Sequence, residues 1–551
     1  MLRERAFPAL PDGAIVLENE DVIVVDKPPF VPCQASGAAA DDLPARLAAH
    51  RAARGDADAY VGVHQRLDRA TSGLVVYAKR REANAWLARA FEGRAVAKEY
   101  VAAVASGRAL PDRARWEDAL REDEDGVVRV VKKGSPRSVV AATEMRVLER
   151  RGERALVGLR IETGRTHQIR AQLAHRGAPI AGDAWYGGAP WRRLLLASVH
   201  LAIPGHLDAR VDPPRSFGDF LAGLHCDPTV DVGYAREILR DAAEHRHALA
   251  HDAGTSCFRW LNDAAEGAPG LALDVYGEHV VLHVYDDRDV GMLARTLVEL
   301  GARGVYLKRR PKRANDLDEA TARALAPPEP IAGEPTAESE IDVLESGVRL
   351  RARLGDGLST GLFLDQRAHR ARVRELAGGA RVLNLFSYTC AFSIFAALGG
   401  AREVVSVDAA RKQLERGTHG FELAGLDPRA HETIADDAFA VLDRFARRGR
   451  SFDLVVCDPP TYSSAGKTRF TSGKMWKELA ARVLRVLAPH GAVLATTNDR
   501  RASQRDLRAA FHEASRATEI RLASLRDLPA PVDFPAPIGS EPHLKGVIAR
   551  R

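Results

Sequence analysis

Residues 350–551 alternate between two kinds of segment, and this alternation constrains the fold more than any other feature of the chain. Apolar runs rich in valine and leucine begin near residues 380, 402, 452 and 492. Helical segments of about a dozen residues separate them. Such alternation predicts a doubly wound parallel α/β sheet with helices on both faces. Ligands of these sheets bind beyond the carboxyl ends of the strands.

The preceding residues follow two other patterns. Over residues 15–205, strand-like runs such as Gly73–Arg80 mix with helical segments without regular alternation, which favours an α+β fold rich in antiparallel sheet. A smaller unit with hairpin turns, one at Gly277, follows from about residue 254. We therefore expect an α+β domain at 1–210, a connector at 211–252, a small central α+β domain at 253–348 and the α/β domain at 349–551.

Composition excludes several classes of protein. Apolar residues make up 46% of the chain and charged residues 28%, which is ordinary for a globular protein. No apolar run approaches the roughly 20 residues that span a bilayer, and the first residues lack the apolar core of a secretion signal. The five cysteines are scattered without a CxxC pair or a Cys/His cluster, which argues against disulfides and structural zinc. We expect a cytoplasmic protein without a membrane or metal partner.

Charge is distributed unevenly along the chain. Residues 51–200 hold 28 Lys and Arg against 18 Asp and Glu, and residues 351–551 hold 32 against 22. Residues 201–350 are acidic, with 16 against 26. Two basic blocks suggest two surfaces for a polyanion such as RNA, with an acidic spacer domain between them. Drift of composition on solvated faces is the alternative.

One carboxylate stands between arginines in the segment QRLDRATSG. Asp68 lies between Arg66 and Arg69, just before a strand-like run. Nearby positive charge favours the ionised carboxylate, and an ionised carboxylate can act as a nucleophile. A loop with local ion pairs explains the same pattern without any chemistry.

Two further segments change this interpretation. Tyr100 lies in KEYVAAV, and Arg165, His167, Gln168 and Arg170 crowd together in ETGRTHQIRAQLAHRGAPIAGDAWYGG. With the segment around Asp68, these stretches resemble the three signature motifs of RluA-type pseudouridine synthases, in the family's order. The resemblance covers about residues 15–205.

This resemblance implies roles for individual residues. Asp68 would be the nucleophile that detaches the uracil base, and Arg170 would pair with it. Arg66 would fill the place of the flipped-out nucleotide, since the target base must leave its helix. Tyr100 would stack on the base and could help to remove the C5 proton. Arg165 and Gln168 would bind RNA, and no cofactor would be needed. The chain departs from the family at Gln65, where histidine is usual, and at Ala70, where an acidic residue is common.

In the α/β domain, polar residues follow the predicted strands. Asp408 comes after the second strand, Asp437 after the third and Asp458 after the fourth. An acidic residue after the second strand commonly binds ribose hydroxyls, which fits a dinucleotide or S-adenosylmethionine. No GxGxxG segment follows a strand, which weakens the case for a dinucleotide-dependent oxidoreductase.

Three segments of this domain resemble motifs of the RlmI/RlmK group of class I ribosomal RNA methyltransferases. They are STGLFLDQRAHR (359–370), NLFSYTCAFS (384–393) and DPPTY (458–462), with Cys390 in place of glycine and Tyr462 in place of phenylalanine. The likeness extends over about residues 254–551. It implies that S-adenosylmethionine is the cofactor, bound by Phe363, Asp365, Gln366, Arg367, Asn384, Phe386, Tyr388, Thr389, Asp408, Asp437 and Asp458. Asp458 and Tyr462 would also face the target base as catalytic residues.

The methylated atom can be argued from chemistry. Methylation of cytosine C5 needs a cysteine that adds to C6. The fifth predicted strand ends Thr496-Thr497-Asn498-Asp499 without a cysteine, and we expect Cys457 to be buried in its strand. Nitrogen methylation needs no covalent catalyst. We favour a guanine nitrogen, with cytosine C5 as the alternative.

Together these observations predict a bifunctional enzyme that forms pseudouridine and transfers a methyl group to a base of 23S ribosomal RNA. One alternative is a methyltransferase whose synthase block only binds RNA. Another is a non-enzymatic RNA-binding or assembly protein. The stretch HRHALAH (245–251) is expected to form a solvated helix face rather than a metal site. Neither the modified nucleotides nor the oligomeric state follows from the sequence.

Overall fold

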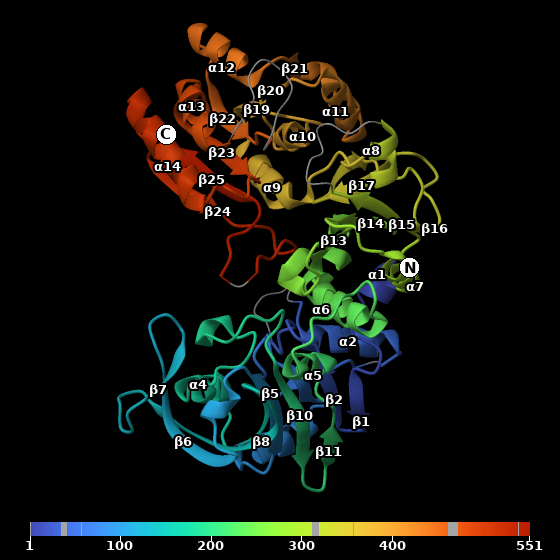
Figure 1. The fold of residues 1–551 in the computed structure, drawn as a ribbon, viewed down its shortest axis with the longest axis vertical. Helices are drawn as coiled ribbons and strands as arrows, with labels where there is room; N and C mark the ends of the chain where they lie inside the picture. The colour runs from blue at the N-terminus through green and yellow to red at the C-terminus, as the bar shows by residue number, and fades with distance from the viewer. Residues whose placement is uncertain are drawn as a thin grey trace. The chain divides into compact units, whose positions relative to one another are not determined.

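The computed structural model describes residues 2–34, 41–56, 58–310, 319–355, 357–460, 472–537 and 539–551 (Figure 1). By their internal contacts these residues form two compact units. The first unit comprises residues 3–248 and 266–268, and the second comprises Leu2, 249–265 and 269–551. Each unit has hydrophobic cores of its own.

The described part of the first unit is built on an eleven-stranded sheet in the order β1-β2-β4-β10-β5-β9-β8-β6-β7, with β3 beside β4 and β11 beside β10. All pairs are antiparallel except β10 with β4. The predicted α+β fold rich in antiparallel sheet is therefore confirmed. The strands are β1 (Ile15–Glu18), β2 (Val22–Lys27), β3 (Gly62–Val63), β4 (Ser72–Ala78), β5 (Ala97–Val104), β6 (Arg113–Glu122), β7 (Val128–Val131), β8 (Val139–Arg151), β9 (Arg154–Ile161), β10 (Leu196–Ile203) and β11 (Leu207–Arg210).

Both faces of the central strands are buried because apolar residues occupy most successive positions along them. Val22 and Val24 of β2 pack into one core, and Ile23 and Val25 pack into the core on the opposite face. This division follows from the two-residue period of a strand. Four helices pack against the sheet: α2 (Leu43–Ala53), α3 (Ala83–Glu92), α4 (Gln168–His175) and α5 (Arg215–Ala222). The unit also contains most of α1 (Leu2–Ala6) and of α6 (Val232–His251).

Residues 211–248, expected to form a connector, belong to the first unit by their contacts. Carboxylates of α6 pair with arginines of the sheet region: Glu244 with Arg46 at 2.5 Å, and Asp241 with both Arg192 and Arg193. These side chains are at least nine-tenths buried. Since a buried charge needs a partner, α6 completes the charge balance of this unit.

The second unit begins with a small five-stranded sheet in the order β12-β13-β14-β15-β16. The strands are β12 (Cys257–Asn262), β13 (Leu271–Tyr276), β14 (His279–Val284), β15 (Gly304–Arg309) and β16 (Ala332–Gly333), with helices α7 (Gly291–Glu299) and α8 (Glu319–Leu325). The predicted turn at Gly277 joins β13 to β14, and its φ of 61° suits glycine. A separate hairpin of β17 (Ile341–Glu345) and β18 (Val348–Ala352) follows.

The remainder of this unit is built on a seven-stranded sheet in the order β21-β20-β19-β22-β23-β25-β24. Strands β19 to β23 are parallel to their neighbours, and β25 runs antiparallel to β23 and β24. The strands are β19 (Arg381–Leu385), β20 (Glu403–Asp408), β21 (Glu432–Ala435), β22 (Phe452–Cys457), β23 (Leu487–Thr497), β24 (Ser524–Leu528) and β25 (Lys545–Arg550).

Helices cover both faces of this sheet, which confirms the predicted doubly wound fold. Val441 of α12, Leu479 of α13 and Phe511 of α14 pack into one core, and Val373 of α9 and Phe392 of α10 pack into the core on the other face. The helices are α9 (Arg367–Leu376), α10 (Ala391–Leu398), α11 (Arg411–Leu423), α12 (Ala438–Arg447), α13 (Ser472–Arg485) and α14 (Gln504–Thr518). Helix α13 ends at Arg485, because the chain pairs with β22 from residue 487 onward.

Other expectations can be checked against the described residues. Within them, no helix has both the length and the apolar character needed to cross a membrane. All five cysteines are free. The expected solvated face at residues 245–251 is wrong for two histidines of α6: the His245 ring lies 3.8 Å from that of Phe30, and His247 contacts Asp41 at 3.0 Å and is 8% exposed.

Candidate active sites

The loop that precedes β4 presents Asp68 to a cavity of about 540 Å³ in the first unit. The Asp68 side chain is 28% exposed, and its Oδ2 lies 3.3 Å from Nη1 of Arg170. The predicted pairing of these two residues is present in the structure. Nε2 of His167 lies 3.7 Å from the same oxygen. Burial lowers the pKa of His167, although the Asp68 charge opposes this, so a neutral imidazole faces the carboxylate.

Arg170 is held in place by a second carboxylate, that of Asp183. The guanidinium donates from Nε to Oδ2 at 2.7 Å and from Nη2 to Oδ1 at 2.8 Å, and the Asp183 side chain is 1% exposed. The Tyr186 ring lies 5.0 Å from the guanidinium carbon. Burial alone would lower the pKa of Arg170. The hydrogen bonds and the charge of Asp183 have the larger effect and raise this pKa above its ordinary value. The arginine therefore approaches Asp68 in a fixed orientation.

Tyr100 of β5 lines the same cavity and is 7% exposed. Burial raises the pKa of Tyr100 well above its ordinary value, and the charge of Asp68 raises it further. The phenol is therefore protonated near neutral pH, which favours stacking on a base over proton removal.

The three residues expected to bind RNA lie in different settings. Arg66 and Arg165 are exposed at the cavity. Gln168 is 4% exposed, and its amide oxygen accepts hydrogen bonds from Thr163 Oγ1 and the Arg165 N–H. Its amide nitrogen donates to the carbonyl of Ala142 and to Oγ1 of Thr143. Because the protein saturates the Gln168 amide, we expect this residue to shape the loop rather than to contact RNA.

A buried lysine supports the loops around Asp68. Nζ of Lys27 donates to the carbonyl oxygens of Pro28, Val31 and Arg69 at 2.9, 3.0 and 3.1 Å. The side chain is fully buried, and burial lowers its pKa to about 8. Since Arg69 follows Asp68 directly, these bonds fix the backbone beside the carboxylate.

In the second unit, the loop between β19 and α10 carries three of the predicted residues, Phe386, Tyr388 and Thr389. Phe386, Tyr388 and Cys390 have left-handed backbones with φ of 58°, 48° and 61°. This conformation is uncommon for residues other than glycine and is found at functional sites. Thr389 Oγ1 donates to the Gly361 carbonyl at 2.7 Å, and Tyr388 Oη donates to Ser359 Oγ at 3.0 Å. The segments 359–361 and 386–390 are thus joined, as their joint assignment to one site predicts.

The acidic residues expected at the cofactor lie at neighbouring strand ends. Asp408 accepts hydrogen bonds from the backbone N–H groups of Tyr388 and Ala410, both at 2.8 Å. Asp437 caps α12 by accepting from the N–H of Ala440 at 3.0 Å. Asn384 donates from Nδ2 to Ser393 Oγ at 2.9 Å. Each of these carboxylates keeps further acceptor capacity for a ligand.

Asp458 at the end of β22 lies in the most unusual electrostatic environment of this site. Its Oδ1 accepts from Thr496 Oγ1 at 2.7 Å, and that hydroxyl accepts from Gln366 Nε2 at 3.0 Å. Burial raises the pKa of Asp458 to about 7, because the bond from Thr496 offsets only part of the desolvation. Burial likewise raises the pKa of Asp365 to about 6. Two half-buried carboxyl groups with raised pKa values mark a functional site.

Two family models match the chain, one in each half. The model for S-adenosylmethionine-dependent methyltransferases matches residues 287–547, and the model for RNA pseudouridylate synthases matches residues 21–175. A ribosomal RNA large subunit methyltransferase of Deinococcus radiodurans is 32% identical over 367 residues, which is 65% of this chain and 83% of the relative. The chain belongs to the S-adenosylmethionine-dependent methyltransferases.

This methyltransferase also contains an RNA pseudouridylate synthase domain in its first unit. A second relative, the ribosomal RNA large subunit methyltransferase I of Aeromonas salmonicida, is 29% identical over 268 residues, which is 49% of this chain and 67% of that protein. The fold is similar to that of SMU.776, a candidate methyltransferase solved in complex with SAH. The TM-score is 0.52 at 24% identity, over 64% of this chain and 89% of the other.

Three further residues expected at the methyltransferase site differ in their surroundings. Arg367 forms a buried bidentate pair with Asp533, in which one bond is 2.9 Å long. Asp533 is 0% exposed, so Arg367 holds the chain around residue 533 in place. Phe363 is 48% exposed beside the Tyr388 ring, at a centroid distance of 5.5 Å. Tyr462 lies outside the described residues.

Cys457 is 1% exposed within β22, as expected, and burial raises the pKa of its thiol well above the ordinary value. A thiolate is therefore disfavoured at this position. Among the described residues, no group of His, Cys, Asp or Glu side chains is placed to hold a metal ion.

Sequence reasoning missed two supporting carboxylates of these sites. Asp183 lies inside the third synthase motif, in GDAWYG, so its position in the motif was the available signal. Asp533 lies in a proline-rich segment with no recognisable pattern, and only its pairing with Arg367 in space reveals its role.

Proposed function

We propose that this protein modifies large-subunit ribosomal RNA in two ways, forming pseudouridine with its first unit and methylating a base with its second, in the cytoplasm. The main support is that each unit surrounds one carboxylate with other residues expected at its site. Asp68 faces Arg170 in one cavity, and Asp458 lies among Gln366, Thr496 and Asp365 at the strand ends of the other unit. The names of the Deinococcus radiodurans and Aeromonas salmonicida relatives support ribosomal RNA as the substrate.

In the first unit, the Asp68 carboxylate acts as the nucleophile towards the target uridine. Asp68 forms a bond to C1′ as the bond between C1′ and N1 breaks. The detached base then turns, and C5 displaces Asp68 to form the bond between C1′ and C5. C5 loses its proton and N1 gains one, so atoms and electrons balance without a cofactor. Arg170, oriented by Asp183, lies 3.3 Å from Oδ2 of Asp68 and holds this carboxylate towards the cavity.

Access of the uridine to Asp68 requires a flipped nucleotide. The exposed Arg66 is placed to occupy the vacated position in the RNA, and Arg165 is placed to contact phosphates. Tyr100 stacks on the base from the cavity wall. The positive charge of this region supports RNA binding through the backbone.

In the second unit, the residues at the strand ends fit S-adenosylmethionine. Asp408 offers acceptor oxygens for ribose hydroxyls, and Asp437 and the loop 386–390 lie at neighbouring strand ends. When bound, S-adenosylmethionine supplies a methyl group on a positively charged sulfur. Asp458 and Thr496 hold the acceptor base, and the dry surroundings of Asp458 strengthen its hydrogen bonds.

We favour a guanine nitrogen as the acceptor atom. The buried, protonated thiol of Cys457 does not supply the nucleophile that cytosine C5 chemistry needs, whereas a carboxylate at a strand end suits a nitrogen acceptor.

Nucleoside mass spectrometry of large-subunit ribosomal RNA from a deletion strain and its parent tests this proposal. Loss of one pseudouridine and one methylguanosine is the expected result. Loss of the methylated base alone would leave the synthase domain as an RNA-binding module, and loss of 5-methylcytosine would overturn the assigned atom. Unchanged RNA would favour a non-enzymatic role or another substrate.

A further inference from the structure

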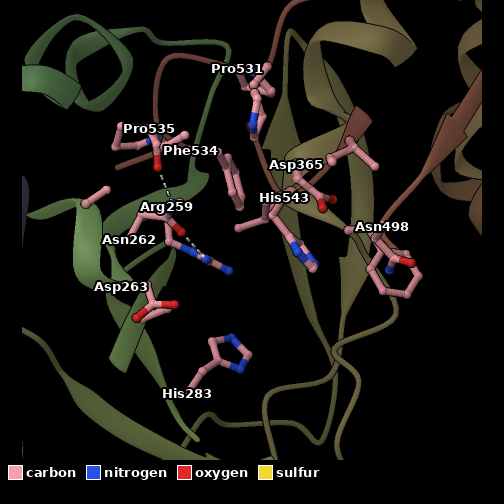
Figure 2. Close-up of a pocket in the computed structure, with 18 of the residues that line it drawn as sticks. Arg259, Asn262, Asp263, His283, Asp365, Asn498, Pro531, Phe534, Pro535 and His543 are labelled. Carbon is pink, nitrogen blue, oxygen red and sulfur yellow. Dashed lines mark hydrogen bonds between the residues drawn. The ribbon is translucent and has the colours of Figure 1, made fainter. Parts of the chain in front are cut away.

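The second unit contains a cavity of about 670 Å³ that extends beyond the expected cofactor residues. The small five-stranded sheet forms one wall with Arg259 and His283, and Asp365 and Asn498 come from the wall opposite (Figure 2). The segments 530–537 and 541–545 also line the cavity, with Phe534 and His543 among their residues (Figure 2). The acidic central domain, expected to be a spacer, therefore contributes side chains to a ligand-sized cavity.

Two arginines line this wall, and they differ in whether a carboxylate of the described residues pairs with them. Arg259 donates to Asp274 at 2.5 Å and to Asn262 at 2.7 Å, so its guanidinium is bound within the protein. Arg310, just after β15, contacts Nδ1 of His283 at 3.2 Å. Among the described residues no carboxylate pairs with Arg310, and burial lowers its pKa. A half-buried guanidinium without a counter-ion is a site for an anionic group, and its planar fork suits a phosphate.

Four carboxylates also line the cavity, and three of them are engaged. Asp274 pairs with Arg259 and His283, Asp263 accepts from the N–H of Gly270, and Glu541 accepts from the N–H of Gln504. Asp365 is the exception, since no other residue of the described chain donates a hydrogen bond to its carboxylate. Its side chain faces the cavity (Figure 2). A free acceptor at this depth suits the N–H groups of a nucleobase.

Asp365, which we expected at the cofactor, lines the cavity and is close enough to Asp458 for its charge to act on that carboxyl group. Gln366 follows it in the chain and bonds to Thr496, the partner of Asp458. Asn498, directly after the end of β23, also lines the cavity, so a ligand there lies beside the strand ends at which methyl transfer is proposed.

We propose that this cavity holds the acceptor nucleotide of the methyl transfer, with its base against Asp365 and a phosphate of the RNA backbone at Arg310. The central domain is then part of the substrate site. The inference rests on the proposed RNA methylation. Arg500, exposed at the rim of the cavity, is placed to contact a neighbouring phosphate.

Arg310→Met in the full-length protein tests this inference, and Arg309→Met is its matched control. The two residues are adjacent, but Arg309 donates to the carbonyls of Asp286 and Arg288, both at 3.0 Å, and is engaged there. The assay measures methyl transfer to unmodified 23S ribosomal RNA transcribed in vitro. Calorimetry measures the Kd for S-adenosylmethionine.

For Arg310→Met, the KM for RNA is expected to rise about tenfold, which corresponds to the loss of one phosphate contact of about 1.4 kcal/mol. The Kd for S-adenosylmethionine should stay within about twofold, and Arg310→Lys should recover part of the loss because it keeps the charge. Arg309→Met should leave the KM within about twofold, because single contacts elsewhere on a surface add little.

An unchanged KM for Arg310→Met, or an equal rise for Arg309→Met, would overturn the inference. A weaker Kd for S-adenosylmethionine would assign the cavity to the cofactor instead. If Arg310→Met does not fold, the exposed Arg500→Met serves as the test, and a KM equal to that of the wild type would count against the proposal. A wild-type protein that methylates no RNA would overturn the proposed function and this inference together.

Discussion

Asp183 accepts two hydrogen bonds from Arg170, at 2.7 and 2.8 Å, and leaves the third nitrogen of the guanidinium 3.3 Å from Asp68. The buried pair thus aims an arginine that would otherwise adopt several rotamers. Loss of Asp183 would leave a buried positive charge without its main partner.

We therefore expect Asp183→Asn to lower the free energy of unfolding by about 3 kcal/mol, as for other broken buried ion pairs. Pseudouridine formation should fall by more than the decrease in the fraction of folded protein, because Arg170 loses its orientation. Urea unfolding and a pseudouridine assay measure the two effects. The control is Glu162→Gln, which breaks the exposed pair with Arg115 and should cost less than about 1 kcal/mol. Equal effects of the two substitutions would contradict the prediction.

The two activities should separate by single substitutions. Asp68→Asn removes the nucleophile and should abolish pseudouridine formation, while methyl transfer continues because Asp458 lies in the other unit. Asp458→Asn should have the opposite effect. Nucleoside mass spectrometry of RNA treated with each variant provides the measurement. If Asp68→Asn leaves the pseudouridine content unchanged, the first unit only binds RNA.

Methyl transfer should depend on pH through Asp458, whose pKa is raised to about 7 by burial. The carboxylate is the better acceptor, so the single-turnover rate should increase as pH rises through about 7 and level off above it. Asp458→Asn should lose this dependence together with most of the rate. The measurement covers pH 5.5 to 8.5, about 1.5 units either side of that pKa. A wild-type rate that stays constant over this range would show that methyl transfer does not depend on the ionisation of Asp458.

The same shift has a consequence for stability, with the opposite sign. The folded pKa lies above the unfolded value, so the contribution of Asp458 is fully present below about pH 4 and is lost as pH rises through 7. Asp458→Asn should therefore raise the Tm above pH 7 relative to the wild type. Thermal unfolding at about pH 4 and about pH 8.5, below and above the range in which this contribution is lost, gives the comparison. A lower Tm for the variant at the higher pH would contradict this account.

Lys27 should be essential for the loops around Asp68. Lys27→Met leaves the carbonyls of Pro28, Val31 and Arg69 without their donor, and we expect a loss of about 3 kcal/mol at roughly 1 kcal/mol per bond. Lys79→Met, which removes a more exposed ion pair with Glu18, should cost less than about 1 kcal/mol. Chemical unfolding of both variants decides this, and equal losses would rule out the supporting role of Lys27.

Much of the fold could be predicted from local pattern. Strand–helix alternation after residue 350 gave the doubly wound sheet, because period and length distinguish its elements. The antiparallel β24 and β25 and the early end of α13 could not be predicted, since tertiary pairing with β22 and β23 decides them. The burial of His245 and His247 was missed for the same reason: their partners Phe30 and Asp41 lie about 200 residues away in the sequence.

The candidate sites show a similar division. Asp68, Arg170 and Asp458 were identified because they lie in continuous motifs. The roles of Asp533, of Lys27 and of the cavity at Arg310 depend on contacts between distant segments. No spacing rule connects such residues, because only the folded chain brings them together.

The pairing of α6 with Arg46, Arg192 and Arg193 limits where the coding sequence can be divided into two genes, one for each activity. A polypeptide ending after the last synthase motif would leave Arg192 and Arg193 without the carboxylates of α6, and Arg46 with Asp41 as its remaining partner. An autonomous synthase would therefore need the coding sequence through α6. A recombination point before this helix would yield a protein that carries every signature motif of the synthase and still lacks part of its interior.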